Sequence, residues 1–86
     1  MRRDNEFFGE AELDLIYVAH RLRDALKIEN LLSVAGVDYL VETGTYMGGL
    51  LFKRELTGAF FYVAPKDREP ARDLLVKNRY KPYEVL

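Results

Sequence analysis

The sequence predicts a single α+β domain whose elements follow the order βαββαβ. Short apolar stretches rich in β-branched and aromatic residues alternate with two segments whose apolar residues recur every three or four positions. In addition, the tetrapeptide Ile16-Tyr17-Val18-Ala19 has a counterpart in Phe61-Tyr62-Val63-Ala64, and each copy leads into a predicted helix. We therefore expect two βαβ halves of similar structure.

The first half contains a strand, a helix and a second strand. Residues 13–19 have strand-forming composition. From Arg21 onward the apolar spacing predicts a helix, and Gly36 is its expected stop. The predicted buried stripe of this helix is Ala25, Ile28, Leu32 and Ala35, widened by Leu22, Leu26 and Leu31. Alternating residues over 37–42 predict a second strand with one wetter face.

The second half repeats this order. Residues 59–64 are apolar throughout, which is typical of a central strand. Asp67 is the expected N-cap of a second helix. The predicted buried face of that helix is Ala71, Leu74 and Leu75. Residues 80–86 predict a last strand, and Pro82 favours an edge position because proline cannot donate a ladder hydrogen bond.

These elements predict a ferredoxin-like βαββαβ sandwich. Its antiparallel sheet would have the strand order 4-1-3-2, with both helices on one face. The domain would span residues 13–86, preceded by an N-terminal arm of residues 1–12.

Composition and charge exclude several kinds of site. The 86 residues leave room for one core, and 49% of them are hydrophobic. The chain has no cysteine and one histidine, so we expect no disulfide, no metal site and no cofactor. A formal net charge of −1 does not favour nucleic acid or membrane surfaces. With no signal peptide and no apolar run long enough to span a membrane, the predicted location is cytoplasmic.

The sheet face opposite the helices is the first candidate functional surface. If Ile16 and Val18 point toward the helices, their neighbours point away, and the second copy of the motif behaves alike. The candidate interface residues are therefore Leu15, Tyr17, Phe60 and Tyr62. Such a patch is too apolar for the solvated surface of a monomer.

Three occupants of this face compete, and self-association is the favoured one. The second is intramolecular: the N-terminal arm with Phe7 and Phe8, or residues 50–56, would fold over the face. The third is stacking of nucleic acid bases. Residues 57–60 disfavour it, because this stretch lacks the basic residue of the RNA-recognition motif and has alanine where a stacking aromatic belongs.

The glycine-rich connection between the second and third strands is the other candidate. Its glycine N–H groups could form an anion-binding nest, with neighbouring cations as phosphate partners. The candidate ligand-binding residues are Gly48, Gly49, Lys53 and Arg54. The spacing matches neither a dinucleotide fingerprint nor a P-loop, so a flexible hairpin connection is favoured. Residues 50–56 are compatible with a short strand or with part of a mobile loop.

No residue pattern indicates catalysis, and we predict no enzymatic activity. His20 is a lone histidine at a strand-to-helix junction, where a structural role is favoured. A phosphatase of the acylphosphatase type would need a glycine cradle after the first strand, and residues 20–23 offer arginines without one. Residues 1–52 carry net charge −4 and residues 53–86 carry +3, an asymmetry that favours association between copies.

Several short motifs carry a resemblance to a known family. They are Ile16-Tyr17-Val18-Ala19, the helix spacing that ends at Gly36-Val37, the segment Tyr62-Val63-Ala64-Pro65, and Asp67 with Ala71, Leu74 and Leu75. Over residues 13–86 the chain resembles the bacterial family of prokaryotic signal-transducing proteins, a domain of unknown function related in fold to the nitrogen-regulatory P-II proteins.

The resemblance implies that residues 43–58 occupy the place of the P-II loop that contacts partners. No residue matches the P-II nucleotide-binding motifs, so nucleotide binding is not implied. We therefore predict a non-catalytic cytoplasmic regulatory or adaptor module. It would self-associate and recognise an unidentified protein partner through the open sheet face or the 43–58 loop. The alternative is a small-anion or nucleotide sensor that uses the glycine-rich residues 44–54.

Overall fold

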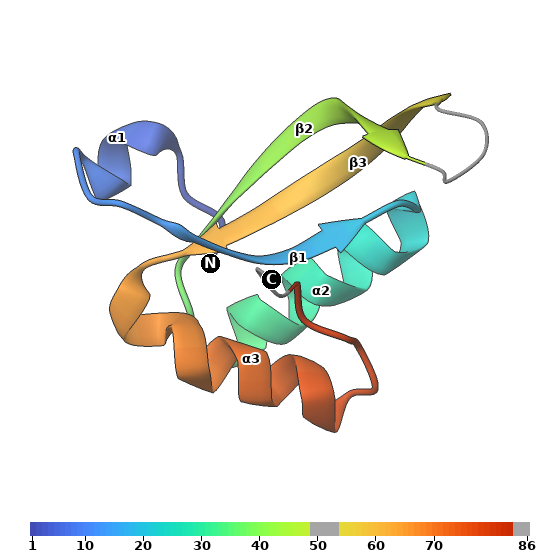
Figure 1. Cartoon of the computed structure of the whole chain (residues 1–86). Helices are drawn as coiled ribbons and strands as arrows, with labels where there is room; N and C mark the ends of the chain where they lie inside the picture. The colour runs from blue at the N-terminus through green and yellow to red at the C-terminus, as the bar shows by residue number, and fades with distance from the viewer. Residues whose placement is uncertain (49–53, 84–86) are drawn as a thin grey trace.

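In the part of the chain that the structure describes, three strands form one antiparallel sheet in the order β1-β3-β2 (Figure 1). They are β1 (Asp14–Ala19), β2 (Tyr39–Gly48) and β3 (Arg54–Val63). The computed structural model describes residues 1–48 and 54–83, and it confirms the predicted α+β class. The order of these strands agrees with the corresponding part of the predicted sheet.

Two helices cover one face of this sheet. They are α2 (Leu22–Val34) and α3 (Arg68–Lys77), and both lie on the same side of the strands (Figure 1). A short 3-10 turn, η1 (Pro65–Asp67), connects β3 to α3. Gly36 follows α2 with φ 75°, which is the left-handed conformation expected of a helix stop.

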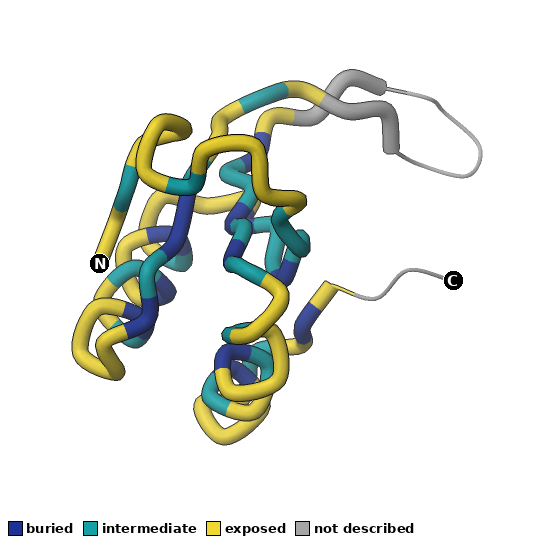
Figure 2. Tube along the Cα trace, turned by 90° about the vertical axis from the view of Figure 1, so that its left-hand side faces the viewer, coloured by how far each residue is buried: buried dark blue, intermediate teal, exposed yellow. Residues whose placement is uncertain are grey.

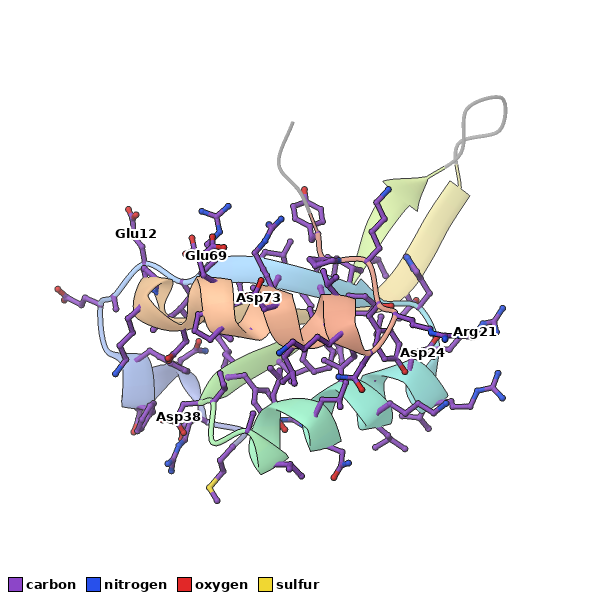
Figure 3. All side chains as sticks on the ribbon, turned by 90° about the horizontal axis from the view of Figure 1, so that it is seen from below. Glu12, Arg21, Asp24, Asp38, Glu69 and Asp73 are labelled. Atoms are coloured by element: carbon purple, nitrogen blue, oxygen red, sulfur yellow. The ribbon has the colours of Figure 1, made fainter. Side chains whose placement is uncertain are left out.

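The core lies between the sheet and the helices, where Figure 2 shows the buried segments gathered. Ile16, Phe61 and Val63 enter it from the sheet and are fully buried, as predicted for these three residues. The helices contribute Ala25, Ile28, Leu32, Ala71 and Leu75. Charged side chains such as Asp24, Glu69 and Asp73 lie on the helix side of the molecule, seen from below in Figure 3.

The prediction that Leu22 and Leu26 widen the buried stripe of α2 is wrong. The side chains are 76% and 56% exposed, respectively. At about 100° per residue, both lie roughly 90–130° around the helix from the stripe centred on Ala25, Ile28 and Leu32. Two large apolar side chains are therefore left on one flank of α2.

The predicted fourth strand differs from the structure. Residues 80–83 are not in a strand, and residues 84–86 lie outside the described part of the chain. Arg79 adopts φ 66°, which turns the chain after α3. Pro82 has no N–H to donate, and in residues 80–83 one backbone bond reaches the sheet, from the Tyr83 N–H to the Ile16 carbonyl at 2.7 Å.

The N-terminal arm is ordered against the sheet. Residues 1–3 run parallel to the start of β2, where Arg2 forms a bridge with Tyr39. The chain then forms the short helix α1 (Asn5–Phe8) on the side of the sheet opposite α2 and α3 (Figure 1). The Asp4 side chain caps this helix by accepting a hydrogen bond from the Phe7 N–H at 3.1 Å.

Candidate functional site

A β-bulge in β1 decides which residues reach the open face of the sheet. Leu15 pairs with Tyr62, but the next pair is Tyr17 with Phe61, so that Ile16 is an extra residue in β1. A bulge of this kind reverses the alternation of side chains beyond it. Tyr17 consequently shares the side of Phe61, whose side chain is in the core.

The prediction that Tyr17 points to the open face is therefore wrong, and so is the prediction for Ala19. The Tyr17 ring contacts Tyr80 edge to face, with 5.7 Å between ring centroids, on the helix side of the sheet. Burial raises the pKa of Tyr17, with further contributions from the Asp24 carboxylate of α2 and from Tyr80. Ala19 is 3% exposed in the core.

The other three predicted residues share the open face. Tyr62 of β3 lies between Leu15 of β1 and Leu40 of β2 in the strand register. Phe60 lies between Val18 and Glu42. Leu15, Phe60 and Tyr62 are all of intermediate exposure, so that the face is neither sealed nor fully solvated.

Gly44 shapes this face next to Phe60. A Cβ atom on Gly44 would lie 3.5 Å from Cε2 of the Phe60 ring, an ordinary van der Waals contact. The ring therefore extends from β3 over the backbone of β2. Since Gly44 carries no side chain, the aromatic surface continues toward the outer edge of the sheet.

The N-terminal arm covers one end of the face. An open pocket there is lined by Asn5 of α1 together with Leu13, Leu40, Glu42 and Tyr62. Leu40 is 7% exposed and lines this pocket together with Asn5 of the arm. The Phe7 ring, in contrast, is 51% exposed. It packs edge to face on Phe8 at 5.0 Å between centroids and lies 4.5 Å from the Arg3 guanidinium carbon.

The Glu42 carboxylate lies beside this apolar surface. Glu42 faces Phe60 in the strand register. Burial raises the pKa of Tyr62, and the Glu42 carboxylate adds to this increase because it disfavours a second negative charge nearby. The open face is therefore aromatic with a local negative charge, which opposes a polyanionic ligand.

The predicted ligand-binding residues are only partly described. Gly48 and Arg54 face each other at the far ends of β2 and β3, while Gly49 and Lys53 lie outside the described residues. In an extended strand, successive N–H groups point to opposite edges. Gly44 and Gly48 lie within β2, so their backbone does not form the converging N–H groups of an anion nest.

Backbone bonds of the N-terminal arm were not anticipated from the sequence. The Tyr39 N–H donates to the Met1 carbonyl at 3.1 Å, and the Arg3 N–H donates to the Tyr39 carbonyl at 2.7 Å. The Arg3 side chain also pairs with Asp38, with 2.8 Å between Nε and Oδ1. Opposite charges at Arg3 and Asp38 were the one available sequence signal, but they are 35 residues apart.

Further properties complete the description of the site. Within residues 1–48 and 54–83, no group of three or more His, Asp or Glu side chains is placed to hold a metal ion. None of the helices found in those ranges combines the length and apolarity required to cross a bilayer.

Comparisons with protein-family models, curated proteins and solved structures gave no match.

Proposed function

We propose that this chain is a non-catalytic regulatory or adaptor module of the cytoplasm, which self-associates and which recognises a protein partner through its open sheet face. One observation carries the proposal: α2 and α3 cover one face of the sheet, while Leu15, Phe60 and Tyr62 remain partly exposed on the other. Contiguous apolar surface of this kind is typical of interaction sites.

The charge of the face supports a protein partner over a nucleic acid. Base-stacking proteins combine aromatic rings with cations that follow the phosphates. Here Glu42 faces Phe60, and its carboxylate is near enough to Tyr62 to raise the pKa of that residue. The formal net charge of −1 supports the same choice.

We further propose that the complete fold is ferredoxin-like, with the C-terminal segment in the place of a fourth strand beside β1. The bond from the Tyr83 N–H to the Ile16 carbonyl supports this position. Pro82 is buried there, and the Tyr80 ring packs against Tyr17. The resemblance to the signal-transducing family favours the same fold.

Site-specific photocrosslinking tests the recognition surface. A benzophenone amino acid at Phe60 would lie on the open face, and the same group at Val76 would lie on α3, where the native side chain is 61% exposed. We expect a crosslinked protein, identified by mass spectrometry, at position 60 and none at position 76. Equal crosslinking at both positions, or none at 60, would refute recognition through this face.

Self-association is tested separately by sedimentation velocity. The chain has a mass of 10.0 kDa, so that a dimer and a monomer are readily separated. A monomer at every accessible concentration would refute self-association.

A further inference from the structure

β2 has an outer edge that is only partly occupied. The strand order places β2 at one edge of the sheet. Both the N–H and the carbonyl of Tyr39 bond outward to the N-terminal arm. The β2–β3 register continues without a shift to Gly48, so every second residue after Tyr39 also points its backbone groups outward. These residues are Val41, Thr43, Thr45 and Met47.

This edge lacks the features that normally prevent strands from pairing. Within the described residues, the arm pairs with β2 only at its start. Edge strands are usually short, bulged, or protected by lysine or proline. β2 has ten residues, an unbroken register, no proline and no lysine, and its sole charged residue is Glu42. A long edge of this kind is a template for another extended strand.

The exposed leucines of α2 lie on the flank below this edge. Leu22, Leu26 and Glu29 share one flank of the helix, since they are separated by four and three residues. Glu29 accepts a hydrogen bond from the Tyr39 hydroxyl of β2 at 3.1 Å and pairs with Arg2 of the arm at 3.7 Å. This flank of α2 therefore runs alongside β2. The arm covers its second half at Glu29, and its first half, with Leu22 and Leu26, is exposed.

A pocket joins the leucine flank to the free part of the edge. Leu22 and Ala25 line it from α2, and Thr43 and Thr57 line it from the hairpin. Leu22 and the outward-facing residue Thr43 thus line the same pocket. The free part of the strand edge and Leu22, the first exposed leucine of α2, therefore meet at this pocket.

We propose that this surface binds a second copy of the chain, with β2 of each copy paired antiparallel about a twofold axis at Gly44. This register pairs Thr43 with Thr45 and Val41 with Met47 across the interface. It uses the outward-facing residues that the structure describes beyond Tyr39. Each of these two pairings occurs twice about the axis, so the four facing pairs form about eight backbone hydrogen bonds, two for each pair. The inference rests on the proposed function, because it identifies the surface responsible for self-association.

A second copy fits this surface better than an unrelated strand. A twofold axis at Gly44 places the pocket that Leu22 and Thr43 line near the same pocket of the partner, because Thr43 is next to Gly44 in the strand. The partner thus covers the leucines as well as the strand edge. A twofold axis through an antiparallel pair is perpendicular to the sheet, so both open faces lie on the same side of the dimer. The aromatic recognition surface is thereby doubled.

Charge substitutions in the full chain test the helix flank. Leu26→Lys places a cation at the interface, and Val34→Lys is the matched control, because Val34 is 80% exposed at the other end of α2. By sedimentation velocity we expect the Leu26→Lys chain to be monomeric and the Val34→Lys chain to remain dimeric. Both positions are exposed, so neither substitution should disturb the core, and circular dichroism checks that each variant is folded.

Cysteine substitutions test the register. Because the chain has no native cysteine, each variant contains a single thiol. At the axis, facing Cα atoms of a non-hydrogen-bonded pair lie about 4.5 Å apart, within the range of a disulfide. We expect Gly44→Cys to form a disulfide-linked dimer under mild oxidation, and Val34→Cys to form several-fold less. The Gly44 position has room for a Cβ atom.

The outcomes separate this inference from the proposed function. A dimeric wild type in which Leu26→Lys remains dimeric, or in which Gly44→Cys crosslinks no better than Val34→Cys, overturns β2 pairing but leaves self-association intact. A monomeric wild type overturns both. If Leu26→Lys fails to fold, the crosslinking comparison decides alone.

Discussion

The contact between Tyr17 and Tyr80 predicts a measurable coupling energy. Their edge-to-face geometry, with centroids 5.7 Å apart, is worth about 0.5–1.5 kcal/mol beyond the area that the rings bury. Tyr17→Leu and Tyr80→Leu each remove the ring contact and keep an apolar side chain. We expect each single variant to lose about 1–3 kcal/mol of unfolding free energy, and the double variant to lose less than the sum.

Urea denaturation followed by circular dichroism provides the measurement. A domain of 86 residues has an unfolding free energy of about 4–13 kcal/mol, of which the double variant is expected to lose less than about 6 kcal/mol. Unchanged denaturant slopes would show that the variants differ in stability alone. The coupling energy is the difference between the double variant and the sum of the single variants.

The matched control is the same cycle with Tyr62→Leu in place of Tyr17→Leu. Tyr62 and Tyr80 lie on opposite sides of the sheet, so their effects should add within about 0.3–0.5 kcal/mol. Equal coupling in both cycles, or a larger coupling between Tyr62 and Tyr80, would refute the bulge that turns Tyr17 toward the helices.

Three further substitutions test other parts of the fold. Tyr39→Phe removes the hydrogen bond to Glu29 and should cost about 0.5–1.5 kcal/mol in urea denaturation. Burial raises the pKa of Tyr39 above its value in the unfolded chain. The stability that this difference contributes is complete below about pH 10 and is lost above it, because the unfolded chain loses this proton first. The Tyr39→Phe variant should therefore lose stability less steeply in alkali. Gly36→Ala should cost about 1–2 kcal/mol in thermal denaturation. The cost comes from the positive φ of 75° alone, since no atom lies within 4 Å of the added Cβ to clash with it. An unchanged melting temperature would contradict this. Arg3→Gln breaks the partly exposed pair with Asp38 and should cost less than about 1 kcal/mol, a loss that disappears in high salt.

The elements that could be predicted from the sequence are those specified by local patterns. Ala25, Ile28 and Leu32 repeat at helical spacing, and all three are buried in α2. Gly36 ends that helix because the left-handed conformation is easily accessible to glycine. The apolar residues 59–63 lie in the central strand β3, where both neighbours are strands. Each of these features depends on residues within a few positions of one another.

The side of the sheet to which Tyr17 points could not be predicted in this way. The two related tetrapeptides have nearly the same letters, and a period of two assigns them the same faces. The bulge adds Ile16 to β1 without a counterpart in β3, and its position depends on how the two strands are paired. Because of this single extra residue, Tyr17 does not lie on the open face, although it was one of the four candidate interface residues.

The extent of β2 was also underestimated, for a different reason. Glycine and threonine over residues 43–48 are typical of a loop when read alone. In the structure they pair with β3 from Thr43 opposite Ala59 to Gly48 opposite Arg54. Backbone pairing over the whole hairpin outweighs weak side-chain preferences, because β propensity depends on context.

The N-terminal arm acquires a role that its sequence does not reveal. Its backbone bonds occupy the outward groups of Tyr39 and end where Asp4 begins to cap α1. The arm therefore occupies the start of the edge and leaves unpaired, within the described residues, the outward-facing residues from Val41 to Met47 that flank Gly44. The edge on both sides of the proposed twofold axis is thus available to a second copy, and the register of that pairing is set by the two β2 strands rather than by the arm.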